Sequence, residues 1–484
     1  MNNILRWISL AFFVLVGLTL QAQHFDSLQI YATSKVQVAS KNFQPLWSKA
    51  NRFGISSDSQ VDQVTFFEAV NKYYLGNWNY LSDTSSLLKL EYGATIFNSN
   101  AYSRVVIQQA YAQLKYKSFI VRAGRHRDLW DDLNPELSVG SLGTSGNALP
   151  IPKISAVIND YVNVPLTKGR LQFKGMMSHG WMGKDRFMES WLHEKSFYGR
   201  LNLSRVKLYG GVQHYAEWGG KRPADDVYLD RSLKGFFNVL LVAEANDGSL
   251  PLEDELNGFR PNRAGDQRGL IEFGAEIEFE NFGLQIYNQT PFESGTGIDV
   301  RNIDRILGVR ISPKANISLR DILLEFIHTK QMEEYGKELQ SYYNNGPMKT
   351  GWEYQGMVIG TPIITNRTEG ANYLPITPFN WKASDPIPGN SNIINNRLIG
   401  ANLGTRWRIN QYISIRTKVT PVINYGARNF IHLYGGGKGV FQCYSLFEGK
   451  YQRDNWGLMF SLAGDFGKLY NNFGSGLGFA YSFR

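Results

Sequence analysis

The stretch Leu477-Gly478-Phe479-Ala480-Tyr481-Ser482-Phe483 lies at the end of the chain and alternates large apolar residues with small or polar ones. The segment 456–463 before it alternates in the same way, and so do 88–96 and 271–279. Successive side chains of a β-strand point to opposite faces of the sheet, so each segment has one apolar face. Repeated strands of this kind are typical of a transmembrane β-barrel.

The strand pattern predicts an all-β fold, a transmembrane antiparallel β-barrel. About seventeen strands can be recognised from residue 63 onward. Single-chain bacterial barrels have an even number of strands, with both chain ends on the periplasmic side. An outward strand is therefore expected before residue 63, and residues 28–60 offer the best candidate because Ile30 to Val38 partly alternates. We predict eighteen strands, with sixteen as the alternative.

The same parity sorts the connections between strands. The tight turns at 204–205, 281, 410 and 454–455 fall on the inner side, and the long connections 126–153, 217–267, 291–302 and 332–395 fall on the outer side. Loop 217–267 contains a helix candidate at 232–242, and loop 332–395 is rich in aromatic residues and proline. Such aromatic content argues against disorder in a long loop. We expect these loops to fold over or into the mouth of the barrel.

The start of the chain is typical of a secretory signal peptide. Arg6 precedes an apolar stretch from Ile8 to Leu20, and Gln21-Ala22-Gln23 offers a cleavage site. The apolar stretch is shorter than the ~20 residues that a membrane-spanning helix needs. We expect residues 1–22 to be removed, residues 23–62 to form an N-terminal periplasmic segment with a possible first strand, and residues 63–484 to form the barrel.

Composition fits export and a membrane location. The 484 residues include 48 Gly and one cysteine, Cys443, so no internal disulfide can form. The net charge is +9, or about +8 without Arg6, and the basic residues are scattered rather than gathered in a tract. This distribution argues against nucleic-acid binding and suits lipid phosphates or an acidic polysaccharide.

Three motifs occur in a fixed order. The first is Gly124-Arg125 with Trp130, followed by segments 135–142 and 146–152. The second is segment 213–223, which contains Trp-Gly-Gly, and the third is Ser-Tyr-Tyr-Asn-Asn-Gly at 341–346 with a following Gly-Trp at 351–352 and Val-Ile-Gly-Thr-Pro at 358–362. Together they resemble the capsule assembly proteins of the Wzi family, the third in its Bacteroidetes form. The resemblance runs from about residue 105 to the C-terminus.

The resemblance implies an eighteen-stranded barrel in the outer membrane of a Gram-negative bacterium, acting as a lectin that holds capsular polysaccharide and supports capsule assembly. Its implied partners are capsular or other surface polysaccharide, outer-membrane lipid and lipopolysaccharide, and the barrel-assembly machinery. The chain departs from the family pattern at 130–134, where a Trp- and Gly-rich stretch is replaced by Trp-Asp-Asp-Leu-Asn. A periplasmic helical bundle is also not evident in residues 24–62.

Sugar binding needs aromatic rings for the apolar faces of the sugar and planar polar groups for its hydroxyls. Three clusters on the expected outer side supply that mixture. The candidate glycan-binding residues are Arg125, Trp130, Asp131, Asp132, Trp218, Arg222, Asp225, Asp226, Tyr342, Tyr343, Asn344, Asn345 and Trp352. The alternative is structural, because barrel rims carry aromatic girdles and paired glycines beside Trp218 mark a bend.

Catalytic and metal sites are not indicated. The chain has no Gly-x-Ser-x-Gly or His-Glu-x-x-His motif, and Gly435 to Gly439 lacks the Ser or Thr of a phosphate-binding loop. We therefore expect no catalytic residue, no metal site and no cofactor. The main rival interpretation is a porin or a substrate-specific channel for oligosaccharides or small solutes. Interior-facing charged residues suit either function; they are Lys89, Glu91, Lys207, Glu272, Glu276, Glu278, Arg416 and Lys418.

Overall fold

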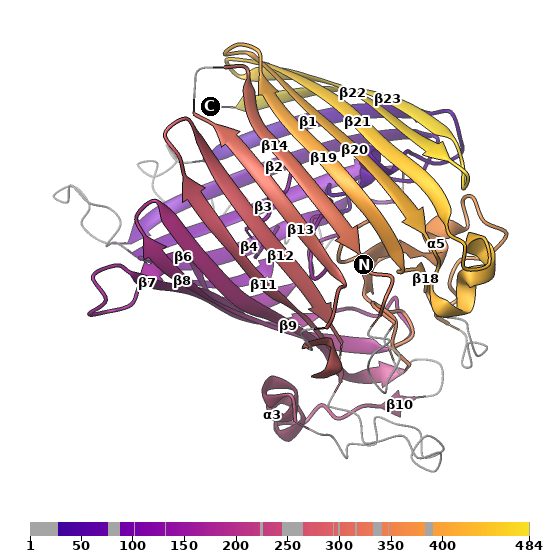
Figure 1. Cartoon of the computed structure of the whole chain (residues 1–484), viewed down its shortest axis with the longest axis horizontal. Helices are drawn as coiled ribbons and strands as arrows, with labels where there is room; N and C mark the ends of the chain where they lie inside the picture. Colours follow the sequence, from indigo (N-terminus) through magenta and orange to yellow (C-terminus); the bar gives the residue numbers. More distant parts are fainter. Residues whose placement is uncertain are drawn as a thin grey trace, which may run out of the picture.

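A computed structural model describes residues 28–75, 88–100, 102–130, 132–222, 226–243, 265–293, 295–298, 301–314, 317–332, 341–346, 348–382 and 391–483. It is a closed antiparallel β-barrel (Figure 1). The expected signal peptide, residues 1–22, lies outside the described residues, as do the candidate residues Asp131 and Asp225.

Eighteen strands of the described chain form the barrel wall, each paired with its neighbours in sequence order. They are β1 (Gln29–Ala39), β2 (Val61–Leu75), β3 (Leu88–Ser99), β4 (Val106–Tyr116), β5 (Phe119–Arg125), β6 (Lys153–Asn163), β7 (Leu171–Trp181), β8 (Glu189–Leu203), β9 (Val206–Arg222), β11 (Asp266–Glu278), β12 (Phe282–Phe292), β13 (Arg305–Pro313), β14 (Leu319–His328), β19 (Leu398–Arg408), β20 (Ile413–Asn424), β21 (Val440–Arg453), β22 (Trp456–Gly467) and β23 (Asn472–Phe483). The ring closes where β1 pairs with β23, with Ile30 opposite Phe483. The predicted count of eighteen is confirmed, and the alternative of sixteen is wrong.

The two ends of the barrel differ. Ile30 and Phe483 lie together at one end, which we call the terminal end, and the tight turns at 204–205 and 454–455 lie there as well. Strand alternation places the four long connections predicted from the sequence, which follow β5, β9, β12 and β14, at the opposite end, the loop end. Short elements occur in these connections: α2 (Leu46–Lys49), β10 (Val227–Tyr228), α3 (Leu233–Leu241), η4 (Gly295–Ile298), β15 (Glu353–Tyr354), β16 (Met357–Val358), β17 (Thr365–Asn366), α5 (Arg367–Gly370), β18 (Ile393–Asn395) and η5 (Arg428–Tyr434).

The wall has an apolar outer face and a polar inner face. Along β11, Phe273 is 55% exposed, whereas its neighbour Glu272 is buried in the lumen. Exposed apolar side chains continue around the barrel, including Phe197, Leu324 and Leu477. Because strand side chains alternate, this pattern confirms the predicted apolar-out, polar-in barrel. None of the helices in the described chain is long and apolar enough to cross a membrane.

Three segments from the loop end enter the lumen. We call them the N-terminal plug (40–60, which contains α2), the lumen loop (126–152) and the mouth loop (329–397). They share one apolar core with inward side chains of the wall. Large buried members are Trp47, Leu137, Leu149, Trp352 and Ile364. The prediction that loop 332–395 folds into the mouth is confirmed, whereas the entry of the lumen loop into the barrel was not predicted.

The helix predicted at 232–242 takes another path. It forms α3, but α3 lies on the outside of the wall, beside β9 and β10 (Figure 1). Trp218 of β9 lies an even number of residues from the exposed Val212, so its side chain also points outward. Phe236 of α3 packs over Trp218, with the ring centroids 5.8 Å apart. The expectation that this helix fills the mouth is therefore wrong.

Candidate functional site

The lumen loop crosses the barrel and is anchored on the opposite wall. Glu325 of β14 is buried and accepts hydrogen bonds from the Ser138 hydroxyl (2.6 Å) and the Val139 backbone N–H (2.9 Å). The same carboxylate also accepts from Tyr287 of β12 (2.6 Å) and Asn402 of β19 (2.8 Å). Bonds to a buried charged acceptor are stronger than neutral ones, so Glu325 fixes the loop firmly to three strands.

The N-terminal plug fills the neighbouring part of the lumen. Its Trp47 stacks on Lys418 of β20, with Nζ 3.2 Å from the ring centroid, and donates from Nε1 to the Thr420 hydroxyl (3.1 Å). Lys418 in turn donates to the Ser138 carbonyl of the lumen loop (2.8 Å). A lysine over an aromatic face is a favourable contact when it is shielded from water. The plug and the lumen loop are thus joined through one wall residue.

The plug also contacts the mouth loop. Lys49 forms ion pairs with Asp58 of the plug (2.5 Å) and with Glu369 of α5 (3.1 Å). Burial alone would lower the pKa of Lys49, but the two carboxylates outweigh burial and raise it. Lys49 therefore stays charged and joins the plug to the mouth loop.

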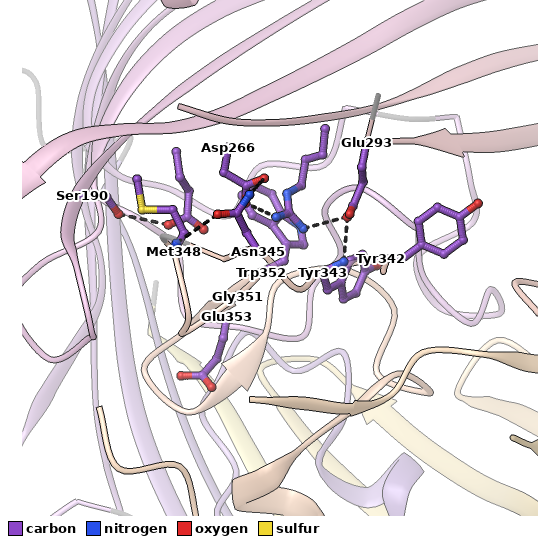
Figure 2. Close-up of polar contacts among 12 residues, drawn as sticks. Ser190, Asp266, Glu293, Tyr342, Tyr343, Asn345, Met348, Gly351, Trp352 and Glu353 are labelled. Carbon is purple, nitrogen blue, oxygen red and sulfur yellow. Dashed lines mark hydrogen bonds and ion pairs between the residues drawn. The ribbon is translucent and has the colours of Figure 1, made fainter. Parts of the chain in front are cut away.

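The mouth loop rests on a buried ionic network (Figure 2). Arg268 of β11 pairs with Asp266 and with Glu293 (3.1 Å), and its guanidinium lies 4.9 Å from the ring centroid of Trp352. The loop reaches this network through Asn345, whose amide donates to Asp266 (3.0 Å). Its Tyr343 backbone N–H donates to Glu293 (2.7 Å). The loop is held by charges at the ends of two wall strands.

The aromatic residues of the mouth loop point inward. Trp352 is 0% exposed and donates from Nε1 to the Gly143 carbonyl of the lumen loop (2.6 Å). The Tyr343 hydroxyl donates to the Leu142 carbonyl (2.6 Å), and burial raises the pKa of Tyr343. These bonds satisfy backbone carbonyls of an irregular segment that has no strand partner. The two loops therefore stack as layers within the barrel.

An exposed polar surface lies at the rim, where β9 continues into β10. Tyr228 is 52% exposed, with Lys221 Nζ and Arg231 Cζ 5.5 and 4.8 Å from its ring centroid. Lys221 also forms an ion pair with the exposed Asp226. The guanidinium of Arg222 lies 5.6 Å from the buried ring of Phe187. We call Lys221, Arg222, Asp226 and Tyr228 the rim patch; it offers an aromatic ring, two cations and a carboxylate on one surface.

A second polar space lies deep in the barrel. Trp130, Asp132 and Lys174 line a cavity of about 210 Å³ on the β6–β7 side of the lumen. Lys174 donates to Asp132 (2.6 Å), and Asp132 also accepts from Tyr161 near the terminal end of β6 (3.3 Å). The cavity is therefore closer to the terminal end of the barrel than the rim patch is.

Comparisons with known proteins agree with this architecture. The family model for Capsule assembly protein Wzi matches residues 20–371, a range that includes the N-terminal plug, the lumen loop and much of the mouth loop. This chain belongs to the Wzi family. The match begins well before residue 105, where the resemblance was placed from the sequence, and it stops within the mouth loop.

Among solved structures, the chain is similar to Wzi of Escherichia coli, described as an outer membrane protein involved in group 1 capsule assembly and a carbohydrate-binding β-barrel. The identity is 12%, over 93% of this chain and 83% of that one, with a TM-score of 0.56. Pseudomonas aeruginosa OpdL (9% identity, 94% and 98% coverage, TM-score 0.48) and OccK5 (9%, 94% and 97%, 0.46) are less alike. At these identities the likeness supports the fold alone. No curated protein matches.

In this Wzi-family barrel, the first predicted cluster does not lie on the outer face. Trp130 is buried against Ile120, Val157 and Met176, and Asp132 lies in the deep cavity. Of the described residues in this cluster, Arg125 alone lies at the loop end, where it donates to the Tyr354 hydroxyl (2.9 Å). The expectation that Trp130 is an exposed loop aromatic is wrong, because the lumen loop turns into the barrel and carries Trp130 down with it.

The other two clusters are also divided by the fold. Trp218 is covered by α3 on the outer wall, while Arg222 and Asp226 stay at the rim. Tyr342, Tyr343 and Trp352 were expected to be exposed and are buried. Asn344 bonds the backbone of Ile393 through both amide atoms, and Asn345 bonds Asp266 and the Met348 N–H. The structure therefore does not bring the predicted residues together in one site.

Two groups of residues were missed by sequence reasoning. Tyr228 lies two residues after Asp226 and two before Asp230, so the mixture of aromatic and polar residues was visible there. Arg268 and Glu293 belong to no motif, and only the register of β11 and β12 brings them beneath the mouth loop. Nothing in the sequence signals that contact.

Proposed function

We propose that this chain is an outer-membrane barrel that binds capsular polysaccharide at the cell surface and supports capsule assembly. The observation that carries the proposal is the family match over residues 20–371, which includes segments that fill the lumen. The similar Escherichia coli protein is itself described as a carbohydrate-binding barrel involved in capsule assembly. The terminal end faces the periplasm, and the loop end faces outward, as in bacterial barrels generally.

The filled lumen favours binding over transport. A porin needs a continuous polar passage, and barrels of this strand number have room for one. Here the plug, the lumen loop and the mouth loop form an apolar core across that space, and bonds such as Trp352 to Gly143 join the layers. Solute flow would require breaking several buried bonds. The channel interpretation is therefore the weaker one.

The rim patch is the surface best suited to the glycan. Tyr228 offers an exposed ring for the apolar face of a sugar, and Lys221 and Arg222 offer cations for an acidic polysaccharide. Asp226 supplies an acceptor for sugar hydroxyls. Aromatic stacking with a few placed polar groups is what small polar ligands need. The buried aromatic residues of the mouth loop support this surface indirectly, by keeping the loop end rigid.

The test is binding of the purified barrel to polysaccharide from the same cells. We expect Tyr228→Ala to weaken binding about fivefold, equal to the ~1 kcal/mol of an aromatic contact. Tyr412→Ala is the matched control, because Tyr412 is also exposed beside an arginine but lies in a turn at the terminal end. A heat-modifiability gel checks the fold of both variants. Wild-type glycan binding by Tyr228→Ala would contradict the rim patch, and rapid solute flux without glycan binding would contradict the function.

A further inference from the structure

The outer wall beneath α3 carries polar side chains that a lipid-facing wall should not carry. His193 and Lys195 of β8 share the outward parity of Phe197, which is exposed to the surroundings of the barrel. His179 of β7 is the cross-strand neighbour of His193 and also points outward. Charged and polar groups facing hydrocarbon are costly. Among the described residues these histidines are not grouped as a metal site.

α3 covers this polar patch with its inner face. The ring centroid of Phe236 lies 5.7 Å from His193, 6.1 Å from His179 and 5.8 Å from Trp218. The Lys195 ammonium donates to the Leu240 carbonyl in the last turn of the helix. A cation at the C-terminal end of a helix is stabilised by the helix dipole and satisfies a carbonyl that has no helical partner. The helix is thus held on the outer wall by the aromatic contacts of Phe236 and by the hydrogen bond from Lys195.

The outer face of α3 is also apolar. Leu233, Phe237 and Leu241 are 79%, 53% and 73% exposed, and their spacing of four residues places them on one stripe. Apart from Lys234 and Asn238, α3 consists of apolar residues and one glycine, a composition that suits a protein core or lipid. Hydrogen bonds within the helix satisfy its central backbone groups, and Ser232 and Lys195 satisfy groups at its two ends, as a segment in hydrocarbon requires. The stripe continues the exposed apolar band of the wall, which includes Phe197 and Val212.

The direction of α3 places its start at the rim and its end deeper along the wall. The residues that precede the helix, Asp230 and Arg231, lie against Gly219 near the outer end of β9. Leu240 reaches Lys195, which is about 20 Å along β8 from the outer end of that strand. The exposed cations Arg231 and Lys234 therefore lie at the shallow end, and Leu241 lies at the deep end.

We propose that α3 is embedded in the outer leaflet and binds a phosphorylated, multiply acylated lipid of the lipid A class. The acyl chains lie along the stripe of Leu233, Phe237 and Leu241, and a headgroup phosphate pairs with Lys234 and Arg231. This inference rests on the proposed outward orientation of the loop end, and it adds a lipid site that adjoins the rim patch, because Arg231 also lies beside the Tyr228 ring. The cations lie nearer the rim of the barrel than the apolar stripe does. In such a lipid the phosphates likewise lie nearer the membrane surface than the acyl chains do.

Lipid binding is tested by native mass spectrometry of the full-length barrel titrated with diphosphoryl lipid A and with the same lipid lacking its phosphates. We expect the wild type to prefer the phosphorylated lipid. Lys234→Glu should weaken binding at least fivefold, since one surface cation contributes ~1 kcal/mol. Lys438→Glu is the matched control, an exposed lysine on the connection between β20 and β21 at the same end. Equal binding of the two lipids, or equal loss in both variants, would overturn the proposal.

The depth of the helix is tested separately. In a Cys443→Ser background, a bimane fluorophore is placed at Leu241→Cys or at Tyr228→Cys, and the barrel is reconstituted with lipids brominated in their acyl chains. We expect strong quenching at position 241 and little at position 228. Equal weak quenching would place α3 in water and overturn the proposal. Polysaccharide binding is measured on the Leu241→Cys sample, in which the rim patch is unchanged, so failure of the glycan function alone leaves both lipid results intact.

Discussion

The lumen loop and α3 both leave the barrel wall at the loop end, yet one turns inside and the other lies outside. The lumen loop is irregular, so its backbone groups need partners, and the inner wall supplies them from Glu325, Asn402 and Lys418. α3 bonds its own backbone and needs only an apolar surface and one cation, Lys195. Whether a segment satisfies its own backbone thus decides which side of the wall it can occupy.

The largest loss of stability is expected when Glu325, which anchors the lumen loop to the inner wall, is replaced. Glu325→Ala removes the acceptor of four hydrogen bonds and leaves buried donors on the lumen loop and two strands. We expect a loss of about 3–5 kcal/mol in unfolding free energy, because the orphaned groups stay buried.

The measurement is urea unfolding in detergent, followed by a heat-modifiability gel. Glu278→Ala is the control, since Glu278 pairs with Lys314 at the exposed terminal end and should change stability little. Unfolding of Glu325→Ala at the wild-type urea concentration would show that the lumen loop is held by packing alone.

A smaller loss of stability is expected from a charge on the outer face of β11, and a much smaller one from a charge on its inner face. Phe273→Arg puts a charge on the outer face of β11, and we expect a cost of ~2–4 kcal/mol in a folding assay with lipid. Glu276→Arg changes an inner residue that is 28% exposed and pairs with the partly exposed Lys207 at 3.3 Å, so a much smaller loss is expected. Equal tolerance of both variants would mean that the faces of β11 are assigned wrongly.

The smallest effect concerns the response of the lumen loop to acid. Burial would raise the pKa of Asp128, but a hydrogen bond from His126 and the charges of Lys153 and Arg122 outweigh burial and lower it. A carboxyl group whose pKa is lower in the folded protein than in the unfolded chain stabilises the fold at any pH above the unfolded-state pKa. That stabilisation is lost as the pH falls through the folded-state pKa. Asp128→Asn should therefore be less stable than wild type at neutral pH, with the difference shrinking in acid. Limited proteolysis of the loop across pH measures it, and a difference that is constant with pH would contradict the assignment.

Sequence reasoning predicted the wall well and the loops only in part. Alternation along 271–279 predicted the faces of β11 because each strand side chain has just two directions available. Loop residues have no such constraint. Trp130 and Trp352 are buried and Tyr228 is exposed, because the path of each loop depends on wall residues far away in the sequence, such as Glu325 and Arg268. Helix α3 was predicted correctly as a helix and placed on the wrong side of the wall.

Pairing of the first strand with the last sets the order of assembly. β1 can meet β23 only after almost the whole chain has been synthesised, and such distant contacts form slowly. The N-terminal plug follows β1 directly, and its Leu46 N–H bonds Asp465 of β22 across 419 residues (2.8 Å). The plug is therefore held by a strand that forms only when the end of the chain has been made. The chain segment that seals the interior is joined directly to the strand that closes the ring, so the seal and the seam depend on the same late contacts.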